Sequence, residues 1–188
     1  MSWTPRTTAP TTADTIYPWD WGTTGQCTWY AYFRVQEGFG MSDPPCWQSG
    51  YGTSGPPGYG SGKYNNAATW LDHYRDPWET KPTSYSPVPG DLAVFSTASP
   101  AGHVAVIESI VNSTTAMVSD YNIALDESFK YRSWTIGGGI GSTGVLIGYL
   151  HYPDSGPYPP TPTPDDPITI SIVANIILKK GGNFNVKL

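Results

Sequence analysis

Residues 102–122, GHVAVIESIVNSTTAMVSDYN, carry the pattern that decides the fold. Residues 103–110 and 116–121 are mainly apolar runs of strand length, and turn-forming residues separate them. Asn112 and Ser113 favour a tight turn because their short polar side chains bond readily to nearby backbone groups. The stretch therefore predicts an antiparallel hairpin in which Asn112 and Ser113 are the two turn residues.

Three further strands and two helices are predicted around this hairpin. Apolar residues recur at helical spacing over residues 26–36 and 66–74, and Gly38 is expected to stop the first helix. Because both helices precede a series of strands with hairpin spacing, the fold class is predicted as α+β, with N-terminal helices packed on an antiparallel sheet. The additional strands are expected at residues 92–95, 131–136 and 145–150.

Composition divides the chain into one domain with appendages. Residues 1–16, rich in Thr, Pro and Ala, predict an extended N-terminal arm, and residues 17–153 form the main domain. Within it, the Gly- and Pro-rich residues 38–63 predict a long irregular loop. Alternating Pro, Thr and Asp over residues 154–167 predict a semi-rigid linker, and residues 168–188 form a short tail or the start of a further module.

Charge and hydropathy argue against two classes of partner. The net charge is −5, and Lys179-Lys180 is the only basic pair, so the chain lacks the positive face that nucleic-acid binding requires. The longest apolar run, residues 168–178, is too short for a membrane span. The first residues lack the pattern of a secretory signal, which predicts action from inside the producing cell, delivery by another route, or earlier removal of a signal.

Cys27 is the first candidate for chemistry, because it lies at the start of the helix predicted at 26–36. A helix N-terminus carries partial positive charge and favours the thiolate, which is the nucleophilic form of cysteine. A lone cysteine is more often a small buried apolar residue, so its position alone does not identify a nucleophile. Cys46 is the second cysteine, and no spacing rule predicts a disulfide between the two.

His103 supplies the base that such a nucleophile requires, since it opens a strand directly after a glycine. With a two-residue turn at 112–113, His103 lies opposite Asn122, and Ala105 lies opposite Asp120. Side chains alternate along a strand, so Asp120 and Asn122 are expected on the face of His103. Either group would fix the orientation and tautomer of the imidazole, as the third member of a triad does.

Six segments together resemble the CHAP family, the cysteine- and histidine-dependent amidohydrolases/peptidases of the papain-like group that includes the NlpC/P60 enzymes. The resemblance extends over residues 17–152 in order, spacing and character. The matching segments are residues 25–30 (GQCTWY), 66–70 (NAATW), 87–95 (PVPGDLAVF), 102–108 (GHVAVIE), 118–122 (VSDYN) and 148–150 (GYL).

This resemblance implies a papain-like fold and cleavage of peptidoglycan through a thioester, as an N-acetylmuramoyl-L-alanine amidase or a peptide endopeptidase. It places Cys27 as nucleophile and His103 as base. Asp120 stands where many members carry Glu, and Asn122 follows two residues later, so both stay candidates for orienting His103. The backbone N–H of Cys27 is expected to stabilise the oxyanion, with the Gln26 side chain as a second candidate.

No cofactor is required by this chemistry, although some phage members bind calcium in an Asp-rich loop before the nucleophile. Asp20 is the one candidate ligand here, and Pro18 stands where a second carboxylate would help. Calcium prefers six to eight oxygen ligands, so calcium is not expected. Trp19 and Trp21 are candidates for lining a substrate groove, since their rings combine an apolar face with a polar N–H.

The leading hypothesis for the source is a bacteriophage lysin whose partner is bacterial peptidoglycan. It would be either an endolysin, passing from host cytoplasm to cell wall, or a part of the virion tail, with residues 154–188 contacting other tail proteins. One alternative is a non-catalytic wall-binding or structural tail module. The other is a secreted bacterial enzyme that remodels the wall.

Overall fold

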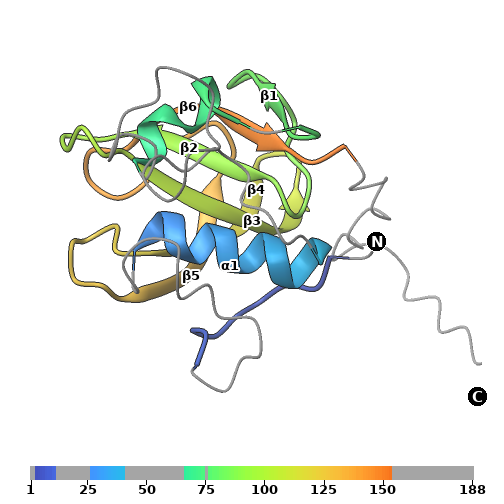
Figure 1. The fold of residues 1–188 in the computed structure, drawn as a ribbon, viewed down its shortest axis with the longest axis horizontal. Coiled ribbons are helices and arrows are strands. Elements are labelled where there is room, and N and C mark those ends of the chain that lie inside the picture. The colour runs from blue at the N-terminus through green and yellow to red at the C-terminus, as the bar shows by residue number, and fades with distance from the viewer. Residues whose placement is uncertain (1–2, 12–25, 41–65, 75, 154–188) are drawn as a thin grey trace, which may run out of the picture.

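The computed structural model describes residues 3–11, 26–40, 66–74 and 76–153. Within them, six strands form one antiparallel sheet in the order β1-β6-β2-β3-β4-β5 (Figure 1), and two helices precede the strands. The predicted α+β class, with helices packed on an antiparallel sheet, is confirmed. The elements are α1 (Cys27–Phe39), η1 (Ala67–Asp72), β1 (Glu79–Lys81), β2 (Leu92–Ser96), β3 (His103–Asn112), β4 (Thr115–Tyr121), β5 (Phe129–Thr135) and β6 (Val145–His151).

Several predicted features lie outside the described residues. They are Asp20, Trp19, Trp21, Cys46, residues 41–63 of the loop predicted at 38–63, the linker at 154–167 and the tail at 168–188. Neither described helix is long and apolar enough to cross a membrane.

The first helix runs past its predicted stop at Gly38. It ends at Phe39, and Gly40 closes it in the left-handed conformation (φ 66°) with its N–H donating to Gln36 O. Gly38 has a different task, since a Cβ atom there would lie 2.2 Å from the ring of Trp3. The glycine therefore allows the N-terminal segment to pack closely on the helix.

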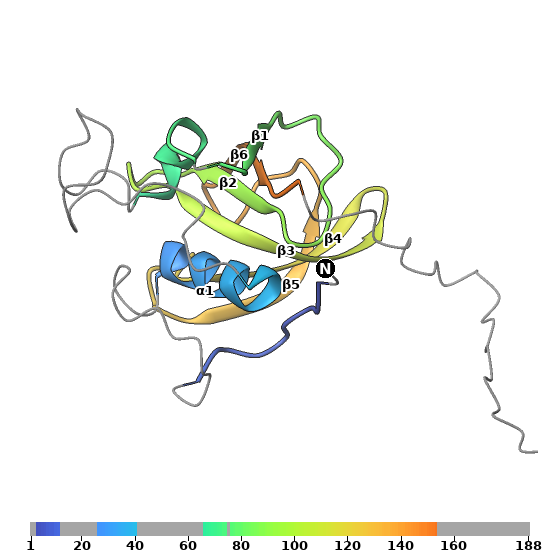
Figure 2. The same ribbon diagram turned by 45° about the vertical axis from the view of Figure 1, so that its right-hand side comes forward.

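The sheet carries an apolar core on each face. Helix α1 packs on β3 and β4, while η1 packs on β2, β3 and β6 (Figure 2). Burial of α1 is broad, with Trp29, Tyr30 and Phe33 all in the first core. The second core includes Phe95, Trp134 and Tyr149. Strand β2 is buried on both faces, which explains its continuous apolar sequence.

The hairpin that decides the fold has the predicted pairing beside the site but a different turn. Asn112 pairs with Thr115, so the turn residues are Ser113 and Thr114, and the prediction of Asn112-Ser113 is wrong. Two irregularities in the ladder then shift the register, and Val106 pairs with Ser119. This is the register that was predicted from Ala105 opposite Asp120. The physical reason is a pair of β-bulges in β3, because each bulge adds one unpaired residue and so shifts the register by one.

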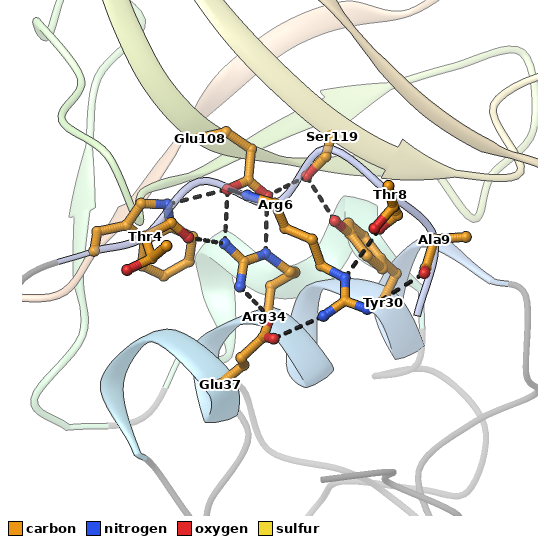
Figure 3. A network of polar contacts seen from close by, with 10 residues as sticks. Thr4, Arg6, Thr8, Ala9, Tyr30, Arg34, Glu37, Glu108 and Ser119 are labelled. Carbon is orange, nitrogen blue, oxygen red and sulfur yellow. Dashed lines mark hydrogen bonds and ion pairs between the residues drawn. The ribbon is translucent and has the colours of Figure 1, made fainter. Parts of the chain in front are cut away.

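The N-terminal residues 3–11 contain no helix or strand, yet they dock on the domain beside α1 (Figure 3). Trp3 is buried, and its Nε1 donates to Glu108 Oε2 at 3.1 Å. Glu108 also accepts from Arg34 and Ser119, so its buried carboxylate is fully engaged. Arg6 donates to Glu37 on the outer side of α1. These contacts make the segment part of the domain packing.

Candidate active site

Cys27 is the first residue of α1 and borders a cleft of about 390 Å³. Its thiol is free and partly exposed. Gln26 before it has extended backbone (φ −95°, ψ 155°), so the helix starts abruptly at the cleft. The other walls come from the start of η1, residues 97–103, the turn after β4 and residues 142–143. The partial positive charge of the helix start therefore lies at the position of the thiol.

His103 opens β3 and borders the same cleft, with its side chain buried. Gly102 before it is in the left-handed conformation (φ 67°). A Cβ atom on Gly102 would lie 2.7 Å from Ala68 N and from Phe95 O, so η1 and β2 leave no room for a side chain. The glycine thus lets the chain turn tightly into β3 and fixes where His103 begins.

Asp120 lies behind His103 on β4 and is fully buried. Its Oδ1 is 3.6 Å from His103 Nε2, and neither atom has a hydrogen-bond partner elsewhere among the described residues. The other carboxylate oxygen, Oδ2, accepts from Arg132 on β5 at 2.5 Å. One oxygen of the Asp120 carboxylate is therefore directed at the imidazole, and the other oxygen is bound by the Arg132 guanidinium.

The pKa of His103 is shifted by its surroundings. Burial of the ring lowers it, but the neighbouring Asp120 carboxylate and the Cys27 thiol outweigh burial and raise the pKa to about 9. A raised pKa favours the charged imidazolium at neutral pH. Cys27 and His103 both border the cleft, and the buried Asp120 lies next to His103, so the three residues form a row from the cleft inward.

Asn122 comes near the site but makes other contacts. It lies just after β4 in the left-handed conformation (φ 62°), so its side chain does not follow the strand alternation that put it beside His103. Its Nδ2 donates to Gln26 Oε1 at 2.7 Å, and its Oδ1 accepts from Glu127 N at 2.9 Å. The residue therefore joins the turn after β4 to the residue that precedes Cys27.

Two kinds of site residue were not predicted from the sequence. Arg132 was not predicted, because the turn between β4 and β5 spans residues 122–128 and no short turn fixes its register. Polar groups of the cleft wall were also missed. They are Asn66, Thr97, Ser99, Ser142 and Thr143, which lie in loops or at an element boundary without any periodic signal. Only the resemblance of residues 66–70 pointed toward one of them.

Across residues 3–11, 26–40, 66–74 and 76–153, no group of three or more His, Cys, Asp or Glu side chains is arranged to hold a metal ion.

The family model of the CHAP domain matches residues 16–122. The chain belongs to the CHAP domain family. The matched CHAP segment includes Cys27, His103, Asp120 and Asn122, whereas Arg132 on β5 lies beyond it. No curated protein matches the chain.

Two solved structures resemble this CHAP domain. The crystal structure of Ly7917 aligns at 14% identity with a TM-score of 0.47, covering 67% of this chain and 52% of that chain. The crystal structure of Ly7917 with the hydrolyzing product of MDP aligns at 15% identity with a TM-score of 0.44, covering 67% and 53%. The chain therefore spans about half the length of these solved structures.

Proposed function

We propose that this CHAP domain is a peptidoglycan hydrolase that cleaves an amide or peptide bond of the bacterial cell wall with Cys27 as nucleophile. The observation that carries the proposal is the row formed by Cys27, His103 and Asp120 at one cleft. A thiol at a helix start, an imidazole beside it and a buried carboxylate behind are the parts of a cysteine hydrolase. Membership of the CHAP family supports the same chemistry.

In the first half of the reaction, the Cys27 thiolate attacks the carbonyl carbon of the scissile bond. A carbon–sulfur bond forms, and the carbonyl electron pair moves onto oxygen. The carbon–nitrogen bond then breaks, and the leaving amine takes a proton from the His103 imidazolium. This leaves a thioester on Cys27 and a neutral imidazole, so the raised pKa of His103 provides the acid at the start of the cycle.

In the second half, neutral His103 takes a proton from water, and the resulting hydroxide adds to the thioester carbonyl. The carbon–sulfur bond breaks, the acid product leaves, and the thiolate–imidazolium pair is restored. During both halves, the backbone N–H of Cys27 at the start of α1 stabilises the oxyanion, because helix N-termini favour negative charge. The Gln26 side chain is the second candidate for this role.

We assign the orienting role to Asp120 rather than Asn122. The carboxylate is directed at Nε2 of the imidazole and is buried, which strengthens its charge interaction with the ring. Asn122 instead holds Gln26 and the turn after β4. The proposed role of Asn122 is to hold the cleft wall and the start of α1 in place.

The cleft wall suits a substrate that carries both amide and apolar groups. Asn66 and Ser99 provide polar atoms on one part of the wall, while Ile123 and Leu125 provide apolar surface on another. Leu125 is 82% exposed, so its side chain is available to a ligand. A wall peptide has both kinds of group. The same features fit an amidase and an endopeptidase, so the proposal covers both.

The proposed source is a bacteriophage, as an endolysin or a virion-associated lysin. The support is the Pro-rich stretch at 154–167, which follows the catalytic domain as a semi-rigid linker would. The proposed chemistry needs no metal ion, since a thiolate supplies the nucleophile and an imidazolium the acid. Treatment with EDTA is expected to leave the cleavage rate unchanged, and a loss restored by calcium would contradict this part.

The central test is cleavage of purified Gram-positive cell walls by the wild-type chain and by Cys27→Ala. The wild type should clear the walls, and Cys27→Ala should not. Cys46→Ala is the matched control, because it removes the other cysteine and should retain activity. Equal clearing by wild type and Cys27→Ala would refute the mechanism. Mass spectrometry of the released fragments then distinguishes amidase from endopeptidase cleavage.

Alkylation of Cys27 gives a second test that needs no substrate. A thiolate paired with imidazolium reacts rapidly with iodoacetamide near neutral pH, whereas an unactivated thiol reacts slowly. His103→Ala should slow the reaction of Cys27 markedly. A wall-binding module that retains Cys27 without chemistry would show slow alkylation in both proteins.

A further inference from the structure

The carboxylate of Asp120 is held from two sides. Its Oδ1 faces His103 Nε2 at 3.6 Å, and its Oδ2 accepts a hydrogen bond from Arg132 NH2 at 2.5 Å. Asp120 is fully buried, while the Arg132 side chain is 31% exposed. A buried carboxylate with one oxygen unpaired is costly, and a cation on the other oxygen both lowers that cost and restricts rotation.

Among the described residues, β5 carries two cations near Asp120, Lys130 and Arg132, and the carboxylate is contacted by Arg132. Lys130 is the residue paired directly with Asp120 across β4 and β5. Its Nζ nevertheless lies 3.7 Å from Asp126 in the preceding turn. Arg132 is two residues farther along β5, paired with Val118, and therefore shares the face of Asp120. Its longer side chain reaches the carboxylate diagonally.

We propose that Arg132 is a positioning residue for the hydrolase, which holds the Asp120 carboxylate so that its other oxygen stays directed at His103. This inference rests on the proposed function, and it extends the row to four residues, from Cys27 through His103 and Asp120 to Arg132. Arg132 touches neither the thiol nor the imidazole in this role. Without it, the carboxylate turns away from the imidazole, and the imidazolium loses its support.

The test compares Arg132→Ala with Lys130→Ala, which removes the same charge from the same strand without touching Asp120. For soluble wall peptides, Arg132→Ala should lower kcat roughly 10- to 100-fold, the rate equivalent of one charge-assisted hydrogen bond. KM should change little, because Arg132 does not border the cleft. Lys130→Ala should retain wild-type kcat, and Arg132→Lys should recover part of the loss by keeping a cation.

Chemical rescue separates positioning from a purely structural role. Because the Arg132 side chain is partly exposed, free guanidinium can enter the space left in Arg132→Ala and restore part of kcat. Sodium chloride at the same ionic strength should not restore it. Retention of wild-type kcat by Arg132→Ala, or a loss that neither guanidinium nor Arg132→Lys recovers, would overturn the proposal.

Failure of the proposed function is distinguishable from failure of this inference. If the wild type cleaves no wall peptide, the rate of Cys27 alkylation replaces kcat as the readout. Slower alkylation in Arg132→Ala with recovery by guanidinium supports the positioning role. An alkylation rate equal to that of Lys130→Ala and wild type refutes it.

Discussion

The Nε2 atom of His103 lies 3.6 Å from Oδ1 of Asp120, with both side chains buried. This distance exceeds that of a strong hydrogen bond, so in this arrangement the carboxylate acts on the ring largely through its charge. Asp120 is shorter by one methylene than the Glu that the resemblance to the CHAP family implies at this position in many members. Arg132 on the far side of the carboxylate limits its rotation and so keeps the gap constant.

Replacing Asp120 by Asn tests which residue orients the imidazole. Asp120→Asn keeps the shape but removes the charge, and kcat should fall on the order of 100-fold or more, as in other hydrolases that lose a triad carboxylate. Asn122→Ala should lower kcat about tenfold at most, because it loosens the Gln26 contact without touching His103. Steady-state rates of both variants, with circular dichroism as the control for folding, check this. A larger loss in Asn122→Ala than in Asp120→Asn would reverse the assignment.

The pH dependence of cleavage follows from the pKa of His103, which is raised to about 9 by Asp120 and Cys27 against the lowering effect of burial. The leaving amine needs the proton of the imidazolium, so kcat should decline as pH rises through about 9. In Asp120→Asn the support for the imidazolium is lost and the pKa of His103 falls, so the decline should begin at lower pH. A profile of rate against pH for both proteins checks the direction. Identical alkaline limbs would show that Asp120 does not set the charge of His103.

The predictable part of the site was the part encoded by local pattern. The first helix carries apolar residues at helical spacing, and that spacing placed Cys27 at its start. The hairpin pattern predicts Asp120 opposite Ala105, and the pairing of Val106 with Ser119 agrees with that register, although the turn lies one residue later than predicted. Two bulges absorb that difference, and sequence patterns do not reveal bulges.

The unpredicted part depends on long-range packing. Asn122 was expected on the face of His103, but its left-handed backbone carries the side chain to Gln26. Trp3 belongs to a segment whose composition indicates an arm, and its burial depends on Gly38 and Glu108, which are distant in sequence. Such contacts depend on the tertiary packing of helices and strands, and sequence periodicity does not predict them.

The N-terminal segment should contribute strongly to stability through Trp3. The ring is buried, packs against Phe39 at 5.1 Å between centroids, and donates to Glu108. Trp3→Ala should lower the free energy of unfolding by roughly 3–5 kcal/mol, the usual cost of removing a large buried aromatic side chain. Trp3→Phe keeps an apolar ring but leaves Glu108 with one donor fewer, and it should cost about 1–3 kcal/mol. Urea unfolding of the three proteins checks the order, and an unchanged midpoint for Trp3→Ala would mean that the segment does not dock in solution.

The backbone conformation of Gly102 should affect catalysis, because Gly102 directly precedes His103. The Gly102 φ of 67° disfavours any side chain, and a Cβ atom would also lie 2.7 Å from Ala68 and Phe95. Gly102→Ala therefore combines a conformational cost of about 1–2 kcal/mol with crowding of about 1–3 kcal/mol. Gly137→Ala is the matched control, since Gly137 has a φ of 79° but nothing within 4 Å of the added Cβ.

Both alanine variants should unfold at a lower urea concentration than the wild type, and Gly102→Ala should be the less stable of the two. Only Gly102→Ala should also lose kcat, because relief of the crowding moves the start of β3 and with it His103. The activity is measured where both variants are fully folded, so that the loss reflects geometry and not unfolding. Equal kcat in the two variants would mean that the position of His103 is fixed by β3 itself, without help from the tight turn at Gly102.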